Sequence, residues 1–285
     1  MSKQVRVLVV DDSAFMRREL TNIIESDPEL KVVGKARDGQ DALLKVKELD
    51  PDVVLLDINM PVMDGLTALQ YIMMESPRPC IMVSSLTQEG ALTTFEALEL
   101  GAVDFVAKPS GTISRDIIQV KDELIFKVRA AAGATTRHLR YARFQRKSSS
   151  STSGAIKTKA LGQQIVVIGQ STGGPNTIMD ILPILPQDLG APVIIVQHMP
   201  PFFTSSFAER LNRSCALEVK EAESGDVLEP GKAYLAPGDL HLVVVPRGKG
   251  KQGFMLRTTA FPKDTLYKPS VNITMESALE CFGAN

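Results

Sequence analysis

The chain has 285 residues, which is enough for two domains that each bury a hydrophobic core. Hydrophobic residues make up 44% of the sequence, and 32 Lys and Arg nearly balance 33 Asp and Glu. This composition excludes a disordered chain, and the net charge of -1 excludes recruitment of DNA or an anionic membrane by overall charge. Three widely spaced cysteines favour a cytoplasmic location, and no apolar run reaches the length of a membrane span.

Residues 5–128 show short apolar runs that alternate with amphipathic segments, a pattern typical of a parallel sheet covered by helices. Helical spacing predicts helices near residues 16–24 and 42–49, and Gly101 is a candidate helix C-cap. We therefore expect five β-α units in a first domain, residues 1–128. The expected strands are 7–10, 31–33, 53–56, 80–83 and 105–107.

A basic, serine-rich stretch follows this domain. Residues 133–161 contain seven Lys or Arg, no acidic residue and four consecutive serines. We interpret residues 129–162 as a flexible linker, and a solvated tether is favoured over the alternative of a nucleic-acid patch at 137–147.

The strand and helix alternation resumes at residue 164, with apolar runs at 165–168 and 193–196. Many Gly and Pro residues between 215 and 257 predict short strands and turns inserted in this domain. A last helix is expected over 273–282, and only three residues follow it. The pattern predicts a second doubly wound α/β domain at 163–285, and we expect its C-terminal part to be missing.

Polar residues follow the strands of the first domain at the sheet edge where ligands bind. They are Asp11, Asp12, Asp57, Ser84 and Lys108. Two ionised carboxylates about 4 Å apart repel each other by roughly 4 kcal/mol, so three of them favour a compensating cation, for which Mg²⁺ is the natural candidate. Asp57 is then a candidate nucleophile toward a phosphoryl donor, with Lys108 neutralising charge. For any single residue of this group, helix capping is the alternative.

The segments VDDS (10–13), LDINMPVMDG (56–65), MVSSLT (82–87) and DFVAKP (104–109) resemble the flavodoxin-like receiver domains of two-component response regulators. The resemblance implies that Asp57 accepts a phosphoryl group from a histidine kinase. It also implies that Ser84 is the switch hydroxyl and that Lys108 senses the phosphate. The implied Mg²⁺ ligands are Asp11, Asp12, Asp57 and the backbone carbonyl of Asn59.

The second domain carries the segment GQSTGGP (169–175), which fits G-x-S-x-G between a strand and a helix. This motif predicts a strained turn that presents the Ser171 hydroxyl as a nucleophile. Of the three histidines, His198 is the best-placed base, because it follows the neighbouring apolar run at the same sheet edge. His138 lies in the linker, and His241 is either a pocket residue or, more commonly in such loops, a packed one.

Together with QHMPP (197–201), KEAESGD (220–226) and YLAPGDLH (234–241), this segment resembles the CheB family of chemotaxis protein-glutamate methylesterases, which also deamidate glutamine. The resemblance implies a phosphorylation-activated serine hydrolase whose substrates are methyl-accepting chemoreceptors. In it, Ser171 attacks the ester, His198 acts as base and then acid, and Thr172 supports the site without a cofactor. A receiver that covers the serine site until it is phosphorylated would explain the activation.

The sequence departs from the family in two places. The third triad residue of the family is an Asp in a TGMGxDG segment after the last helix, and that segment is absent from these 285 residues. Losing the orienting Asp of a serine protease lowers turnover roughly 10⁴-fold, so we expect this chain to be a nearly inactive fragment. Lys268 and Asn272 stand where the family usually has Arg and Asp.

The alternative function is a receiver coupled to a non-catalytic binding or adaptor module. No helix-turn-helix pattern follows the linker, whereas the serine motif and His198 both follow strands, so hydrolysis is favoured. Neither nucleic-acid binding nor membrane insertion is expected.

Overall fold

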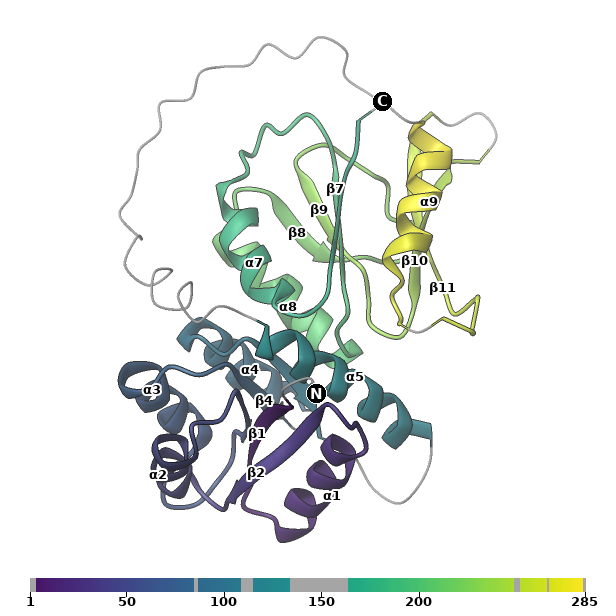
Figure 1. Ribbon diagram of the computed structural model, residues 1–285. Helices are drawn as coiled ribbons and strands as arrows, with labels where there is room; N and C mark the ends of the chain where they lie inside the picture. The colour runs from purple at the N-terminus through teal and green to yellow at the C-terminus, as the bar shows by residue number, and fades with distance from the viewer. Residues whose placement is uncertain are drawn as a thin grey trace. The chain divides into compact units, whose positions relative to one another are not determined.

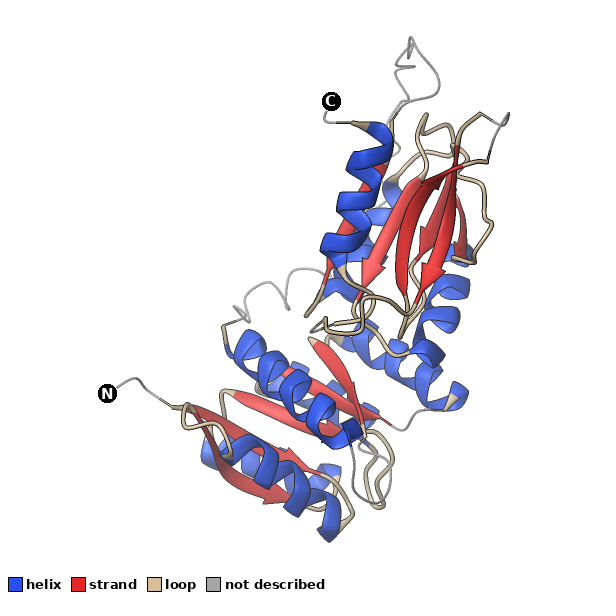
Figure 2. Cartoon of the chain, turned by 90° about the vertical axis from the view of Figure 1, so that its right-hand side faces the viewer, coloured by secondary structure: helices blue, strands red, loops and turns tan. Residues whose placement is uncertain are grey.

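The computed structural model describes residues 4–84, 87–108, 115–133, 164–248, 252–265 and 267–283. The chain divides into two compact units, one within residues 1–150 and the other within residues 151–285 (Figure 1). In each unit, helices flank a set of strands (Figure 2). Among the described helices, none is long and apolar enough to cross a membrane.

The first unit is built on a parallel five-stranded sheet in the order β2-β1-β3-β4-β5. The strands β3 and β4 are buried along their whole length, which explains their continuous apolar sequences. The predicted fold class is confirmed. The strands are β1 (Val5–Val10), β2 (Leu30–Ala36), β3 (Val53–Asp57), β4 (Cys80–Ser84) and β5 (Asp104–Ala107).

Five helices connect and follow these strands: α1 (Ala14–Glu25), α2 (Gly39–Leu49), α3 (Gly65–Glu75), α4 (Gln88–Leu100) and α5 (Arg115–Ala132). Gly101 caps α4 in the left-handed conformation, with φ of 110°, as predicted. Helix α5 runs four residues past the expected domain boundary at 128. The reason is packing, since Ala131 is buried in the core and Arg129 pairs with Asp27. The remainder of the expected linker, 134–162, lies outside the described residues.

The second unit contains a parallel four-stranded sheet in the order β6-β7-β9-β8 and an antiparallel pair, β10 and β11. Helix α9 lies beside β10 (Figure 1). The elements are β6 (Val166–Gln170), α7 (Gly174–Ile181), a 3₁₀ turn (Leu182–Ile184), β7 (Val193–Gln197), α8 (Pro201–Ser214), β8 (Glu218–Glu221), β9 (Lys232–Leu235), β10 (His241–Pro246), β11 (Phe254–Thr259) and α9 (Val271–Phe282).

Residues 215–257 differ from their prediction as an insertion, because two of their strands belong to the main sheet. Strand β9 lies between β7 and β8, where it pairs with both. Its Tyr234 side chain is buried and its hydroxyl donates to the Val227 carbonyl at 2.6 Å. A strand of four residues that begins with Lys is too short to give a clear periodicity, which is why the sequence did not indicate a central strand.

Candidate functional sites: an acidic pocket and a serine–histidine pair

The first unit places the predicted acidic residues and Lys108 together at the carboxyl ends of β1, β3 and β5. The Lys108 ammonium lies 2.7 Å from Asp57 Oδ2 and 3.0 Å from Asp11 Oδ2. Both carboxyl groups are buried, whereas Asp12 is exposed. One lysine therefore contacts two buried carboxylates and offsets only one of their two negative charges, and the third carboxylate faces solvent.

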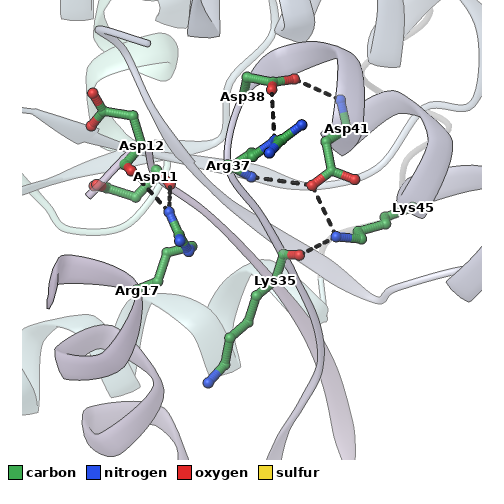
Figure 3. A network of polar contacts seen from close by, with 8 residues as sticks. All are labelled: Asp11, Asp12, Arg17, Lys35, Arg37, Asp38, Asp41 and Lys45. Atoms are coloured by element: carbon green, nitrogen blue, oxygen red, sulfur yellow. Dashed lines mark hydrogen bonds and ion pairs between the residues drawn. The ribbon is translucent and has the colours of Figure 1, made fainter. Parts of the chain in front are cut away.

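Arg17 on α1 fixes the shape of the acidic turn. One of its guanidinium nitrogens donates to the backbone carbonyls of Asp11 and Asp12, at 2.7 and 2.9 Å (Figure 3). The backbone N–H of Ser13 donates to Asp11 Oδ1 at 2.9 Å, and the Ser13 hydroxyl caps α1. These bonds hold the turn through the backbone carbonyls of Asp11 and Asp12 and through the Asp11 carboxylate, and none of them uses the carboxylate of Asp12.

A separate polar network secures the neighbouring turn between β2 and α2. Asp38 accepts from the Asp41 backbone as the N-cap of α2, and the Asp41 carboxylate lies 2.9 Å from the Lys45 ammonium (Figure 3). Helix capping was the alternative role for the acidic residues of the first pocket. Ser13 and Asp38 are the caps of α1 and α2 instead.

The acidic pocket has a donor set that suits a divalent cation. One oxygen each from Asp11, Asp12 and Asp57 lies within 4.8 Å of the others. Apart from the Lys108 ammonium, no described residue donates a hydrogen bond to the inner oxygens of Asp11 and Asp57, although both are buried. Three hard oxygens with spare acceptor capacity match the preference of Mg²⁺.

Electrostatics at Asp57 reflect this crowding. Burial raises the pKa of Asp57 to about 6, and the nearby charge of Asp11 acts in the same direction. The Lys108 ammonium and the Asn59 backbone N–H oppose the shift by stabilising the carboxylate. The pKa of Lys108 is raised because it faces two carboxyl groups.

Two more predicted residues lie around this pocket. Ser84 ends β4, is buried, and its hydroxyl donates to the Gly90 carbonyl on α4 at 3.3 Å. Asn59 follows β3 with an exposed side chain. In the same loop, Val62 has φ of 68° and is 79% exposed, an unfavourable conformation for a β-branched residue.

In the second unit, Ser171 and His198 meet directly, as the strand-edge argument predicted. The strands β6 and β7 are neighbours in which Gln170 pairs with Gln197, so the next residue of each strand reaches the same place. The Ser171 hydroxyl oxygen lies 3.1 Å from His198 Nδ1. This distance is that of a hydrogen bond, in which Nδ1 accepts the hydroxyl proton when the imidazole carries its own proton on Nε2.

The turn at Ser171 is less strained than the G-x-S-x-G pattern predicted. Among the described residues, only Asp50, Val62 and Asp239 have positive φ without being glycine. Gly173, with φ of 74°, makes the left-handed step before α7. The glycine thus absorbs the sharp part of the turn, and Ser171 keeps an ordinary backbone conformation.

Gln197 is a functional candidate that the sequence analysis named only as part of a motif. Its buried side-chain amide donates to the carbonyls of Ser171 and His198, at 3.0 and 3.3 Å. A methyl group on Gly174 would lie 2.0 Å from Gln197 Oε1, so only glycine at the start of α7 leaves room for this side chain. Next to Ser171, the hydroxyl of Thr172 is buried and has no hydrogen-bond partner in the described part of the chain.

His241 is not part of this pair. It is fully buried and accepts the Ser270 backbone N–H at Nδ1, 3.1 Å away, while Nε2 lies 3.0 Å from the Pro262 carbonyl. It is a packed residue, and it begins strand β10 instead of lying in a loop. His138 lies outside the described residues. An aromatic residue that the sequence analysis did not single out, Tyr267, stacks on the His198 ring.

Comparison with known proteins matches both units. The family model for the response regulator receiver domain matches residues 7–118, and the model for CheB methylesterase matches residues 166–285. A protein-glutamate methylesterase/protein-glutamine glutaminase of Caldanaerobacter subterraneus subsp. tengcongensis is 55% identical over 98% of this chain and 78% of its own length. The chain belongs to the CheB family. A relative from Pyrococcus abyssi with the same description is 48% identical over 99% of this chain and 75% of its own.

Solved structures of CheB from Thermotoga maritima resemble the two units separately. Its response regulator domain is 54% identical, with a TM-score of 0.43, and the match covers 47% of this chain and 99% of that domain. Its methylesterase catalytic domain is 42% identical, with a TM-score of 0.40, over 42% of this chain and 62% of that domain.

Proposed function

We propose that this protein hydrolyses methyl esters of glutamate residues in chemoreceptors, deamidates receptor glutamines, and is activated by phosphorylation. The receiver would comprise residues 1–128, the linker 129–162 and the esterase 163–285. One observation carries the proposal: in a CheB-family chain, the Ser171 hydroxyl lies 3.1 Å from His198 Nδ1 at adjacent strand ends, a geometry that suits a nucleophile and its base.

The chemistry assigned to the pair is acyl transfer to serine. His198 Nδ1 accepts the proton of Ser171 as its Oγ bonds to the ester carbon. The bond to the methoxy oxygen then breaks, and methanol leaves with the proton held by His198. Water attacks the acyl-enzyme and gives a proton to His198, which returns it to Ser171 as glutamate is released. With glutamine, ammonia leaves in place of methanol.

The start of α7 supports this chemistry electrostatically. The helix begins at Gly174, three residues after the nucleophile. Its N-terminal partial positive charge favours the negative charge that develops on the carbonyl oxygen. The proposed role of Thr172 is to support the substrate here, because its buried hydroxyl bonds to none of the described residues.

In the receiver, Asp57 is the proposed acceptor of a phosphoryl group from a histidine kinase. Mg²⁺ held by Asp11, Asp12, Asp57 and the Asn59 carbonyl would, when bound, offset the charge of the phosphoryl oxygens. Lys108 is already placed to contact the phosphorylated side chain, since it lies 2.7 Å from Asp57. Ser84 would serve as the switch by exchanging its bond to Gly90 for one to the phosphoryl group.

Activation requires that phosphorylation favour one of two states of the protein that differ in esterase activity. Ser84 lies beside Asp57 at the sheet edge and is bonded to α4 through the Gly90 carbonyl. The bistable element we propose is therefore the hydrogen bond between Ser84 and Gly90, which would break when the Ser84 hydroxyl turns to the phosphoryl group.

The alternative, a receiver joined to a non-catalytic binding module, is tested by methanol release from methylated receptor. The assay compares this chain with one extended through the TGMGxDG segment of the family, each with and without Mg²⁺ and a small phosphodonor. Activity in the extended protein that rises with the phosphodonor supports the proposal. Absence of activity in both proteins, with Asp57 phosphorylated, contradicts it and favours the binding module.

A further inference from the structure

The ring of Tyr267 lies against the ring of His198, with centroids 4.4 Å apart and planes inclined by 18°. This is a stacked pair on the face of the proposed base, whose edge meets Ser171. From this geometry we infer that Tyr267 is a positioning residue for the hydrolysis. It sets the plane of the imidazole and stabilises its charged form.

The loop that carries Tyr267 is anchored on both sides of the ring. Upstream, the Pro262 carbonyl lies 3.0 Å from His241 Nε2, and downstream the Ser270 N–H donates to His241 Nδ1. His241 is fully buried, so both contacts are shielded from water. The buried histidine therefore fixes the two ends of the segment that presents Tyr267.

The start of α9 adds a second anchor beside the serine strand. A methyl group on Gly169 would lie 2.2 Å from the Val271 side chain, which shows how closely α9 approaches β6. Val271 follows Tyr267 by four residues, and Gly169 precedes Ser171 by two. The stack is consequently tied to the strand that supplies the nucleophile.

A stacked ring constrains the rotation of the imidazole that would carry Nδ1 away from Ser171. It also favours the imidazolium that forms when His198 takes the serine proton, because the face of a phenol ring attracts a cation. The second contribution is greater in the transition state than in the ground state. Loss of the stack should therefore lower kcat and leave KM nearly unchanged.

The test rests on the proposed function and uses the extended protein in the methanol assay, together with the rate at which a fluorophosphonate labels Ser171. Tyr267→Leu should lower kcat and the labelling rate about tenfold. Tyr267→Phe keeps the ring and should restore both to within about twofold. Phe261→Leu, an exposed aromatic of the same loop, is the matched control and should change neither.

Activity in Tyr267→Phe shows that the ring, and not a hydrogen bond of the hydroxyl, is responsible for the effect. A change in the labelling rate shows that the effect does not come from receptor binding, because the label is a small molecule. If Tyr267→Leu unfolds, Tyr267→Met replaces it, because methionine fills a similar volume without an aromatic face. The same losses of kcat and labelling rate are then expected. Wild-type rates in the Leu or Met variant, or loss of activity in the Phe variant equal to that in Leu, would overturn the inference. An inactive wild-type protein would instead count against the proposed function.

Discussion

The two candidate sites occupy equivalent places, the carboxyl edges of parallel sheets, yet their side chains differ in chemical type. At Asp57 the pocket holds buried charges, two carboxylates against one ammonium. At Ser171 the hydrogen-bonding groups are a hydroxyl, an imidazole and the amide of Gln197. The same sheet geometry thus serves one site governed by charge and another governed by alignment.

This difference determines what each site should respond to. In the acidic pocket the buried carboxylates repel one another, and binding of a proton or a cation reduces this repulsion. Phosphorylation changes the charge in the same pocket. At the serine site the described contacts of Ser171 are hydrogen bonds, so its performance depends on angstrom-scale placement of the hydroxyl and the imidazole. The following predictions test whether the two sites separate in this way.

The largest effect is expected at the nucleophile. Ser171→Ala should lower methyl-ester hydrolysis by roughly 10⁴-fold or more, because no other hydroxyl replaces the attacking oxygen. Phosphorylation of Asp57, followed by mass spectrometry after treatment with a phosphodonor, should be unchanged. Residual hydrolysis near the wild-type rate would remove Ser171 from the mechanism.

At the acidic pocket, stability should depend on pH through Asp57. Its pKa is 3.8 in the unfolded chain and about 6 in the fold, so the folded protein binds more protons between these values. The free energy of unfolding should therefore fall as pH rises across this window, by about 3 kcal/mol in the absence of metal. Urea unfolding at pH 4 to 8 measures it.

Asp57→Asn should flatten this dependence, raise stability at pH 7.5 by roughly 1–3 kcal/mol, and abolish activation by a phosphodonor while basal hydrolysis persists. Asp122→Asn, at an exposed position on α5, is the control and should leave all three quantities unchanged. If the phosphodonor still activated Asp57→Asn, phosphorylation would act elsewhere.

A smaller effect is expected at Gln197, whose amide joins the two segments that carry Ser171 and His198. Gln197→Met keeps the shape and removes both donated hydrogen bonds, so hydrolysis should fall roughly 10- to 100-fold. Gln187→Met, at an exposed position, is the matched control. Retention of full activity in Gln197→Met would show that alignment does not limit the serine site.

The smallest predicted effect is in the loop after Asp57. Val62→Asn should increase the free energy of unfolding by roughly 0.5–1 kcal/mol, because Asn tolerates positive φ and the exposed valine contributes little burial. Val62→Thr retains a β-branched side chain and should give no gain. Chemical denaturation distinguishes the two variants.

Much of this arrangement could be predicted from the sequence, because apolar alternation located the strands and the edge rule located the residues that follow them. Ser171 and His198, or Asp57 and Lys108, are found in this way. Tyr267 was not, since it comes from an irregular loop with no periodicity to place it. The role of Gln197 was also missed, because the sequence does not indicate which backbone carbonyls a side-chain amide at the end of a strand will contact.

The close contact between Gly169 and Val271 has a consequence for natural variation. Since a single methyl group at 169 would collide with the valine, the two positions cannot change independently. A relative that carries alanine at the first position is expected to carry a smaller residue at the second, or to shift the helix that begins there. Paired substitutions at these two sites in related sequences would therefore indicate that the close packing of α9 on β6 is retained.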